Sequence, residues 1–196
     1  MAMRHAVLAA LLDGEASGYQ LSKLFDVGMA DFWHAVPQQL YSELSRLEDA
    51  GLIKGREVVQ ENRPNKRVFT VTDAGRQELA TFAATPAKPM FLRDDLLVKV
   101  YSADLIDTRL IADQLAERAR QAEAKIERLD QVLERLRDGR DEQTFLAESP
   151  SRIGPYLTCM RGRIFEEEYL RWCTWAIELL RKLPAGLGIT GEAGHS

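Results

Sequence analysis

The sequence has few of the residues from which metal sites and disulfide frameworks are built. Its 196 residues include only 2 cysteines and 3 scattered histidines. Cys159 and Cys173 fall in one predicted helix, where a rise of 1.5 Å per residue separates them by about 21 Å. That separation is far beyond the reach of a disulfide. We therefore expect two buried, inert thiols, no metal and no cofactor.

Long apolar runs and an excess of positive charge are also lacking. No apolar run approaches the ~20 residues of a membrane span, and the first residues do not form a secretory signal. We therefore expect a cytoplasmic protein. The net charge is −4, so bulk charge does not indicate a nucleic-acid partner. A nucleic-acid-binding surface would have to rely on local cations.

Catalytic motifs are missing as well. The sequence contains no nucleophile elbow, P-loop, HExxH or CxxC pattern. Glu166, Glu167 and Glu168 are consecutive, so they spread around a helix instead of converging, and we expect a solvated face there. Residues 186–191 match G-x-G-x-x-G but follow a helix rather than a strand, so the match has no supporting context. We expect no catalytic residues and a protein that is not an enzyme.

The most informative stretch begins at Pro37, which suits the first turn of a helix. Leu40, Leu44 and Leu47 recur at helical spacing and predict one buried stripe. Gly51 supplies the left-handed residue that ends such a helix. Polar side chains suited to reading base edges in a major groove lie on the opposite face: Gln38, Ser42, Ser45, Arg46 and Asp49. The alternative is an ordinary amphipathic helix whose polar face meets only water.

A hairpin is expected directly after this helix. Residues 53–60 and 66–72 are rich in β-branched side chains and flank a turn over 61–65, which predicts two antiparallel strands. The cations at that turn are Arg63, Lys66 and Arg67. A helix presented by a buried stripe and followed by a cationic hairpin is typical of a winged helix-turn-helix, a DNA-binding fold.

Further helices are expected on both sides of this stretch. The first covers residues 4–12, and the second starts at Ser17, which forms an S-x-x-Q capping box with Gln20. A helix-turn-helix order therefore precedes the hairpin. Another helix is expected to follow a cap at Thr72 or Asp73.

Two prolines within residues 85–89 predict a domain boundary. We expect a winged helix-turn-helix DNA-binding domain over 1–84, a linker over 85–92, a helical dimerisation domain over 93–184 and a disordered tail over 185–196. The fold class is therefore mainly α with a small β-hairpin.

The helical domain carries two heptad stripes, on predicted helices over 107–137 and 155–183. Two such helices do not bury both apolar surfaces on each other alone, so we expect an antiparallel hairpin that pairs with a second copy. Packing against the N-terminal domain is the alternative. The residues expected at the dimer contact are Leu115, Ile126, Leu129, Leu133, Phe165, Tyr169, Trp172 and Leu179.

These motifs together resemble the PadR family of bacterial transcriptional regulators. The resemblance covers residues 4–82 and rests on four segments: GYQL at 18–21, QQLY at 38–41, LSRLEDAGLI at 44–53 and RPNKRVFTVTDAG at 63–75.

The rest of the chain resembles one branch of that family. DFW at 31–33 and YLRW at 169–172, within a long helical hairpin, are similar to the branch with a large C-terminal dimerisation domain. That branch includes AphA-like activators and phenolic-acid-responsive repressors. The resemblance implies a homodimer that binds a pseudo-palindromic DNA operator, more often as a repressor, and in some members a small aromatic ligand that releases it.

The resemblance also implies roles for single residues. By position, Tyr19 and Tyr41 would contact phosphates, and Lys66 and Arg67 would hold the DNA backbone from the wing. The residues that would face bases are Gln38, Gln39 and Ser42. The alternative for both tyrosines is a half-buried ring with its hydroxyl in water.

Tryptophans supply the candidates for an effector site. Trp172 and Trp175 lie three residues apart on one predicted helix. Trp33 precedes the predicted helix that begins at Pro37, which we call the reading helix. Aromatic-lined pockets between helices suit flat apolar ligands, although plain core packing explains tryptophans equally well. The competing class of function is a winged-helix module that binds proteins or small molecules and does not meet DNA.

Overall fold

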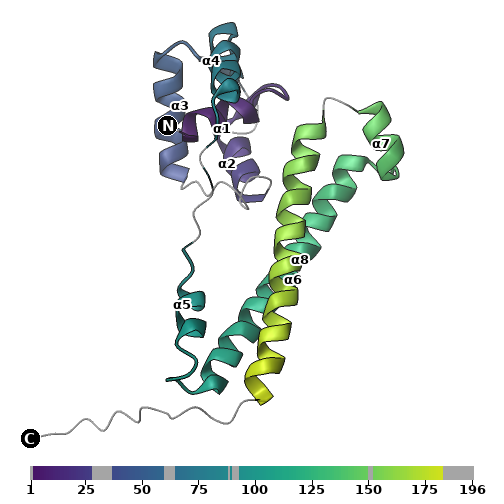
Figure 1. The fold of residues 1–196 in the computed structure, drawn as a ribbon. Helices are drawn as coiled ribbons and strands as arrows, with labels where there is room; N and C mark the ends of the chain where they lie inside the picture. Colours follow the sequence, from purple (N-terminus) through teal and green to yellow (C-terminus); the bar gives the residue numbers. More distant parts are fainter. Residues whose placement is uncertain are drawn as a thin grey trace, which may run out of the picture. The chain divides into compact units, whose positions relative to one another are not determined.

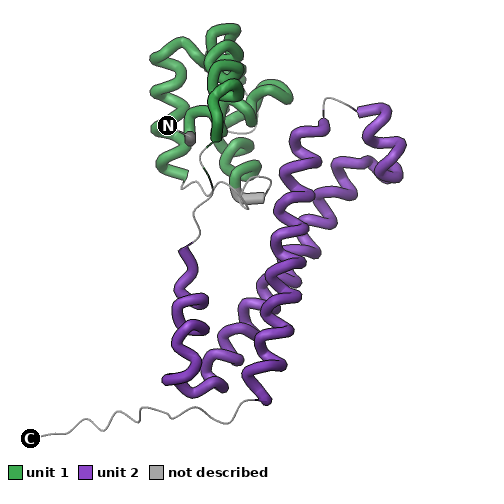
Figure 2. The backbone as a smooth tube through the Cα atoms, viewed as in Figure 1, with its two compact units in different colours: residues 1–89 green, residues 90–196 purple. Residues whose placement is uncertain are grey.

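The structure, a computed structural model, divides the chain into two compact units, residues 1–89 and 90–196 (Figure 2). Trp33, Arg63 and the tail expected over 185–196 lie outside the residues that it describes. The described residues are 2–27, 37–59, 65–87, 89, 93–149 and 152–182.

In its described residues the first unit has four helices and a small sheet (Figure 1). The predicted leucine stripe of Leu40, Leu44 and Leu47 is buried in its core. On the second helix Leu21 and Phe25 are buried as well, whereas Leu24 is 40% exposed. The elements in chain order are α1 (Ala2–Ala10), β1 (Ala16–Ser17), α2 (Gly18–Val27), α3 (Pro37–Asp49), β2 (Ile53–Val58), β3 (Lys66–Val71) and α4 (Asp73–Ala84).

The predicted end of α3 is confirmed. Gly51 adopts φ +70, the left-handed conformation that costs glycine little. The backbone N–H of Leu52 donates to the carbonyl of Leu47 at 2.9 Å, and that of Gly51 to Glu48 at 2.8 Å. These two hydrogen bonds end the helix and direct the chain from α3 into β2.

The sheet contains a strand that the sequence did not predict. Its order is β1-β3-β2, with antiparallel pairing throughout. β1 is only Ala16 and Ser17, which lie opposite Phe69 and Val68 of β3. A two-residue strand has no period to detect, so only its partner reveals it. The pairing joins the start of α2 to the wing.

The predicted capping box at the start of α2 is confirmed. The backbone N–H of Ser17 donates to Gln20 Oε1 at 2.9 Å, and that of Gln20 to Ser17 Oγ at 3.3 Å. The cap of α4 is Thr72, whose Oγ1 accepts the N–H of Gly75 at 3.1 Å and donates to the carbonyl of Leu52 at 3.0 Å. These contacts fasten α4 to the chain segment between α3 and β2.

The described part of the second unit, 93–149 and 152–182, is a helical hairpin with two short helices (Figure 1). Its long helices α6 and α8 pack side by side, and Leu96 and Val100 of the first short helix pack against them. None of the described helices has both the length and the apolar character needed to cross a membrane. The elements are α5 (Asp95–Tyr101), α6 (Thr108–Arg137), α7 (Glu142–Glu148) and α8 (Ile153–Lys182).

Several residues expected at the dimer contact are instead buried between the two long helices of one chain. Leu115, Leu129 and Leu133 of α6 are buried against α8, and Ile126 is half-buried. On α8 the buried face is a set of small, apolar and acidic residues: Tyr156, Cys159, Gly162, Glu166, Cys173, Ala176, Ile177 and Leu180. The residues expected at the dimer contact on this helix lie beside that face, half-buried or exposed: Phe165, Tyr169, Trp172 and Leu179.

Glu166 does not lie on a solvated face, so the expectation for it was wrong. Its side chain is 2% exposed, with Lys125 Nζ 2.7 Å from Oε1 and Arg118 Nη2 3.4 Å from Oε2. Two cations of α6 thus compensate a carboxylate that burial alone would penalise. Glu167 and Glu168 are exposed as expected. The two cysteines, as predicted, are both buried, and no disulfide joins them.

Candidate functional site

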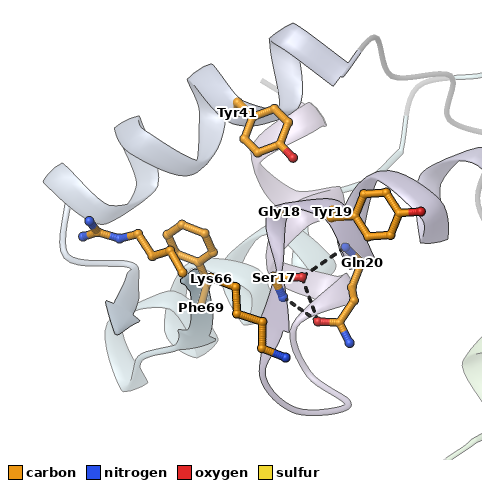
Figure 3. Close-up of a pocket in the computed structure, with 8 residues that line it drawn as sticks. Ser17, Gly18, Tyr19, Gln20, Tyr41, Lys66 and Phe69 are labelled. Carbon is orange, nitrogen blue, oxygen red and sulfur yellow. Dashed lines mark hydrogen bonds between the residues drawn. The ribbon is translucent and has the colours of Figure 1, made fainter. Parts of the chain in front are cut away.

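A hollow of about 530 Å³ lies on the first unit, between the start of α2, α3 and β3. Figure 3 shows side chains from all three elements around it, with the Ser17–Gln20 capping box at one side. The residues that line it are Ser17, Gly18, Tyr19, Gln20, Tyr41, Lys66, Arg67 and Phe69. The fold therefore brings together Tyr19 and Tyr41, expected at phosphates, with Lys66 and Arg67, expected to hold the DNA backbone.

The two tyrosines of the hollow present much of their rings to solvent. Tyr19 is 66% exposed and Tyr41 52% exposed. The ring of Tyr41 lies against the first turn of α2, because a Cβ at Gly18 would come within 2.4 Å of its Cε1. The N-terminus of a helix carries partial positive charge and unpaired N–H groups, which favour an anion. A phosphate in this hollow would meet that charge and the hydroxyl of Tyr41, whereas the hydroxyl of Tyr19 points away from Tyr41 and Lys66 (Figure 3).

The polar face of α3 is open. Gln38, Gln39, Ser42 and Arg46 are all exposed. Arg46 is held loosely, with Nη1 3.5 Å from Glu43 Oε2. The structure thus presents the side chains expected to read bases on the face of α3 opposite its buried leucines.

The cations of the wing differ in how they are held. Arg56 pairs with Glu15 at 2.6 Å, and Arg67 pairs with Glu48 at 2.8 Å. Lys66 is exposed, and no ion-pair partner faces it within the part of the chain that the structure describes. Sequence reasoning treated Lys66 and Arg67 as equivalent and did not identify Glu48, whose partner lies nineteen residues away.

A second pocket, of about 610 Å³, lies in the helical unit between α5 and α8. Its wall is a ladder of rings: Phe165 and Tyr169 stack at 6.2 Å, and Tyr169 and Trp172 at 5.6 Å. The lining residues are Leu97, Phe165, Glu168, Tyr169, Arg171, Trp172 and Trp175. Two of the three predicted effector residues therefore share one pocket, and the third, Trp33, lies outside the described residues.

Tyr169 is the polar residue at the centre of this ladder. Its hydroxyl donates to Asp94 Oδ2 at 2.6 Å, and the guanidinium carbon of Arg118 lies 4.5 Å from its ring centroid. Burial and the bond to Asp94 raise the pKa of Tyr169 to about 12. Asp94 also caps α5 by accepting the N–H of Leu96 at 2.9 Å. Sequence reasoning missed Asp94 and Arg118, since only the folded chain brings them to Tyr169.

The raised pKa of Tyr169 predicts a late step in an alkaline titration. Because the neutral phenol is the form that folding favours, its contribution to stability is complete below pH 10 and is lost as the pH rises through about 12. Absorbance of the phenolate should show one tyrosine ionising near pH 12. Tyr169→Phe should abolish that step, and Tyr101→Phe, which removes a tyrosine 92% exposed, should leave it. A Tyr169→Phe protein that kept the late step would contradict the assignment.

Comparison with known proteins identifies both units. Residues 7–81 match the model of the transcriptional regulator PadR-like family, and residues 92–181 match that of the virulence activator alpha C-term domain. A probable transcriptional regulator of Mycobacterium tuberculosis is 31% identical over 195 residues, covering 93% of this chain and 99% of that protein. The chain belongs to the PadR-like family. The resemblance seen in the sequence is thereby confirmed, as is the expectation of a transcriptional regulator and not an enzyme.

Other PadR-like proteins align over nearly the whole chain. The negative transcriptional regulator PadR of Bacillus subtilis is 28% identical over 181 residues, covering 92% of this chain and 98% of its own. Its crystal structure with operator DNA has a TM-score of 0.76 at 26% identity, covering 92% of this chain and 99% of that one. Its complex with p-coumaric acid has a TM-score of 0.70 at 25% identity, covering 93% and 100%.

Proposed function

We propose that this PadR-like protein is a dimeric repressor that binds a pseudo-palindromic DNA operator through the N-terminal unit. The observation that carries the proposal is the hollow that places Tyr19, Tyr41 and Lys66 beside the open polar face of α3. The similarity to the Bacillus subtilis protein crystallised with operator DNA supports it. Residues 1–84 form the DNA-binding domain in this proposal and residues 93–184 the dimerisation domain, joined by a linker over 85–92.

Each part of the DNA-binding domain has a separate role in this proposal. The first turns of α3 enter the major groove, where Gln38, Gln39, Ser42 and Arg46 meet base edges. Phosphates are held by Tyr19 and Tyr41 in the hollow and by cations of the wing. These wing cations are Lys66 and Arg63, the latter not among the described residues, whereas Arg67, the third cation expected there, is paired with Glu48.

Substitutions in the reading helix α3 and in the wing should have different effects on DNA binding. Gln38→Ala or Gln39→Ala should lose about 1–3 kcal/mol of discrimination at one base pair per half-site, because a glutamine pairs bidentately with adenine. The affinity for scrambled DNA should stay close to wild type. Lys66→Ala should weaken binding to all duplexes alike and lower the salt slope by about 1 for each phosphate that the lysine neutralises. Salt titrations on operator and scrambled DNA measure both effects.

The same experiment separates this function from the competing one. A gel shift with DNA from upstream of the protein's own gene supplies the operator. If wild type retards neither that DNA nor scrambled duplex, the winged helix is a module that binds proteins or small molecules. If Lys66→Ala changes base preference and leaves the salt slope as it was, the assignment of wing and helix is wrong.

Dimerisation is proposed from the apolar surface that one chain leaves uncovered. At 100° per residue the exposed Leu157, Ile164, Trp175 and Leu179 fall within one narrow stripe along α8. We call these four residues the α8 stripe. An apolar stripe of this length on a soluble protein is typical of an interface, and an isologous contact between two copies covers both stripes at once. Phe165, Tyr169 and Trp172 flank it.

A small aromatic effector is proposed for the pocket between α5 and α8. The ring ladder of Phe165, Tyr169 and Trp172 offers stacking surfaces to a flat ligand. The similarity to the PadR structure with p-coumaric acid supports this class of ligand. A ligand in this pocket lies against α5. Because α5 is the first helix after the linker, ligand binding acts on the helix that is joined in sequence to the DNA-binding domain.

Tryptophan fluorescence tests the effector site. Titration with p-coumaric acid or another planar phenolic acid should quench the emission and weaken operator binding. Replacing Trp172 with Leu should reduce the quenching and raise the half-saturating ligand concentration about tenfold or more, since the ligand no longer stacks on an indole. Unchanged fluorescence and operator affinity across a varied panel of aromatic acids would show that the tryptophans serve packing alone.

A further inference from the structure

Arg67 of the wing is bound to the carboxylate of Glu48, in the last turn of α3. Its Nη2 donates to Glu48 Oε1 at 2.8 Å and to Oε2 at 2.9 Å. Oε1 also accepts the backbone N–H of Gly55, on β2, at 2.9 Å. One carboxylate therefore ties the end of the reading helix to both strands of the wing.

The path of the Arg67 side chain depends on the absence of a side chain at Gly55 of β2. A Cβ at Gly55 would lie 2.5 Å from Arg67 Nε and 2.6 Å from Glu48 Oε1. Phe69, paired with Gly55 in the sheet, has its ring centroid 5.9 Å from the guanidinium carbon. The hydrogen bonds from Arg67, more than any other contact, lower the pKa of Glu48, so the carboxylate is charged at neutral pH. The wing and α3 are thus joined by a charged strap through Glu48, Gly55 and Arg67.

This strap changes what Arg67 contributes to binding. A guanidinium that a carboxylate already neutralises releases fewer counterions when DNA arrives. Lys66, the neighbouring cation, is exposed and has no ion-pair partner in the described part of the wing. Among the described cations of the wing, phosphate attraction therefore falls to Lys66, while Arg67 keeps the wing at a set angle to α3.

We propose that Glu48 is a positioning residue for DNA reading, which holds the wing against α3 and withholds Arg67 from phosphates of any sequence. The inference rests on the proposed function. Sequence specificity is the ratio of operator to non-specific affinity, and the strap raises it in two ways. It orders the wing before binding, and it suppresses a sequence-independent phosphate contact.

Four variants of the full chain test the strap: Glu48→Ala, Glu48→Gln, Arg67→Ala and the double variant Glu48→Ala with Arg67→Ala. Asp49→Ala is the matched control, because it removes the same charge from an exposed neighbour on the same helix. Binding to operator and scrambled DNA is measured across a range of salt concentrations. Hydrogen exchange of the Gly55 amide, followed by NMR without DNA, reads the strap itself.

Glu48→Ala is expected to bind scrambled DNA more tightly than Asp49→Ala does and to lose about tenfold in the specificity ratio. Its salt slope should steepen by about 1 as Arg67 reaches a phosphate. The double variant should return the slope to the wild-type value, which a merely structural role of Glu48 would not do. Glu48→Gln keeps an oxygen for Gly55 and should fall between wild type and Glu48→Ala. The Gly55 amide should exchange quickly only where Glu48 is Ala.

Two results would overturn the inference alone. The first is a Glu48→Ala protein with the ratio and slope of Asp49→Ala. The second is a double variant that keeps the steeper slope, because the freed cation would then not be Arg67. Failure of wild type to bind either duplex overturns the proposed function and the inference with it, and the wild-type measurement by itself distinguishes that case.

Discussion

Introducing two carboxylates into the α8 stripe is expected to split the protein into single chains. In the double variant Trp175→Glu with Leu179→Glu, each copy would have to bury two carboxylates against the apolar side chains of the other copy. Desolvating these charges without partners is costly. The variant should run near the 22.1 kDa of one chain, whereas wild type should run near twice that mass. Operator affinity should fall about 100-fold or more, because the two half-sites are no longer bound by one linked particle.

Light scattering after size exclusion, together with operator titration, measures both quantities. Thr158→Glu with Thr174→Glu is the matched control, since it adds the same charge to exposed positions of α8 outside the stripe. That control should remain a dimer with wild-type affinity. A stripe variant that stayed dimeric would place the interface elsewhere on the chain, and a wild type of 22.1 kDa would refute the proposed dimer altogether.

Replacing Gly75 with alanine is expected to destabilise the DNA-binding unit. A Cβ there would lie 2.1 Å from the carbonyl oxygen of Leu52 and 2.8 Å from Val71 Cγ2. That carbonyl is backbone and is held by Thr72 Oγ1 at 3.0 Å, so it has little room to retreat. Overpacking of this kind costs about 1–3 kcal/mol or more. For a unit of this size we expect the melting temperature to fall by roughly 10 °C.

Thermal unfolding followed by circular dichroism checks this prediction, with operator affinity as a second measurement. Gly154→Ala is the control, because no atom lies within 4 Å of the Cβ it would add. Alanine at that exposed helical position should be neutral or stabilise by up to ~1 kcal/mol. Equal melting temperatures for the two variants would show that the contact between α4 and Leu52 yields without cost.

The sequence by itself determined the elements whose signals are local. The leucines of α3 repeat at helical spacing, and Gly51 follows at the position where a left-handed residue closes the last turn. The capping box of Ser17 and Gln20 lies within one turn of chain. Each signal concerns residues a few positions apart, so backbone geometry alone links it to a structure.

The open polar face of α3 was predictable for the same reason. Once one side of a helix is assigned to the core, the exposure of Gln38, Gln39 and Ser42 follows from the helical period of about 3.6 residues per turn. Their proposed contacts with bases do not follow from that geometry, because any solvated helix face has the same period. The fold of the reading unit was thus predictable in outline, while its function came from the match of whole segments to a family.

Only the tertiary structure decided which face of α8 is buried. The helix carries apolar residues on more than one side, and the larger ones, such as Phe165 and Trp172, drew the sequence-based assignment. The buried face instead contains Gly162, Cys159 and Cys173, whose small side chains let α6 approach closely. Hydrophobicity ranks side chains by size, but close packing of two helices also depends on where a large side chain is absent.

The same holds for the charged residues whose roles the sequence misjudged. Glu166 is buried because Lys125 and Arg118 reach it from α6, and Arg67, although exposed, is paired because Glu48 reaches it from α3. The strand β1 exists only because β3 pairs with it. A charge or a backbone group takes its environment from partners distant in the sequence, and folding is what brings those partners within a few ångströms.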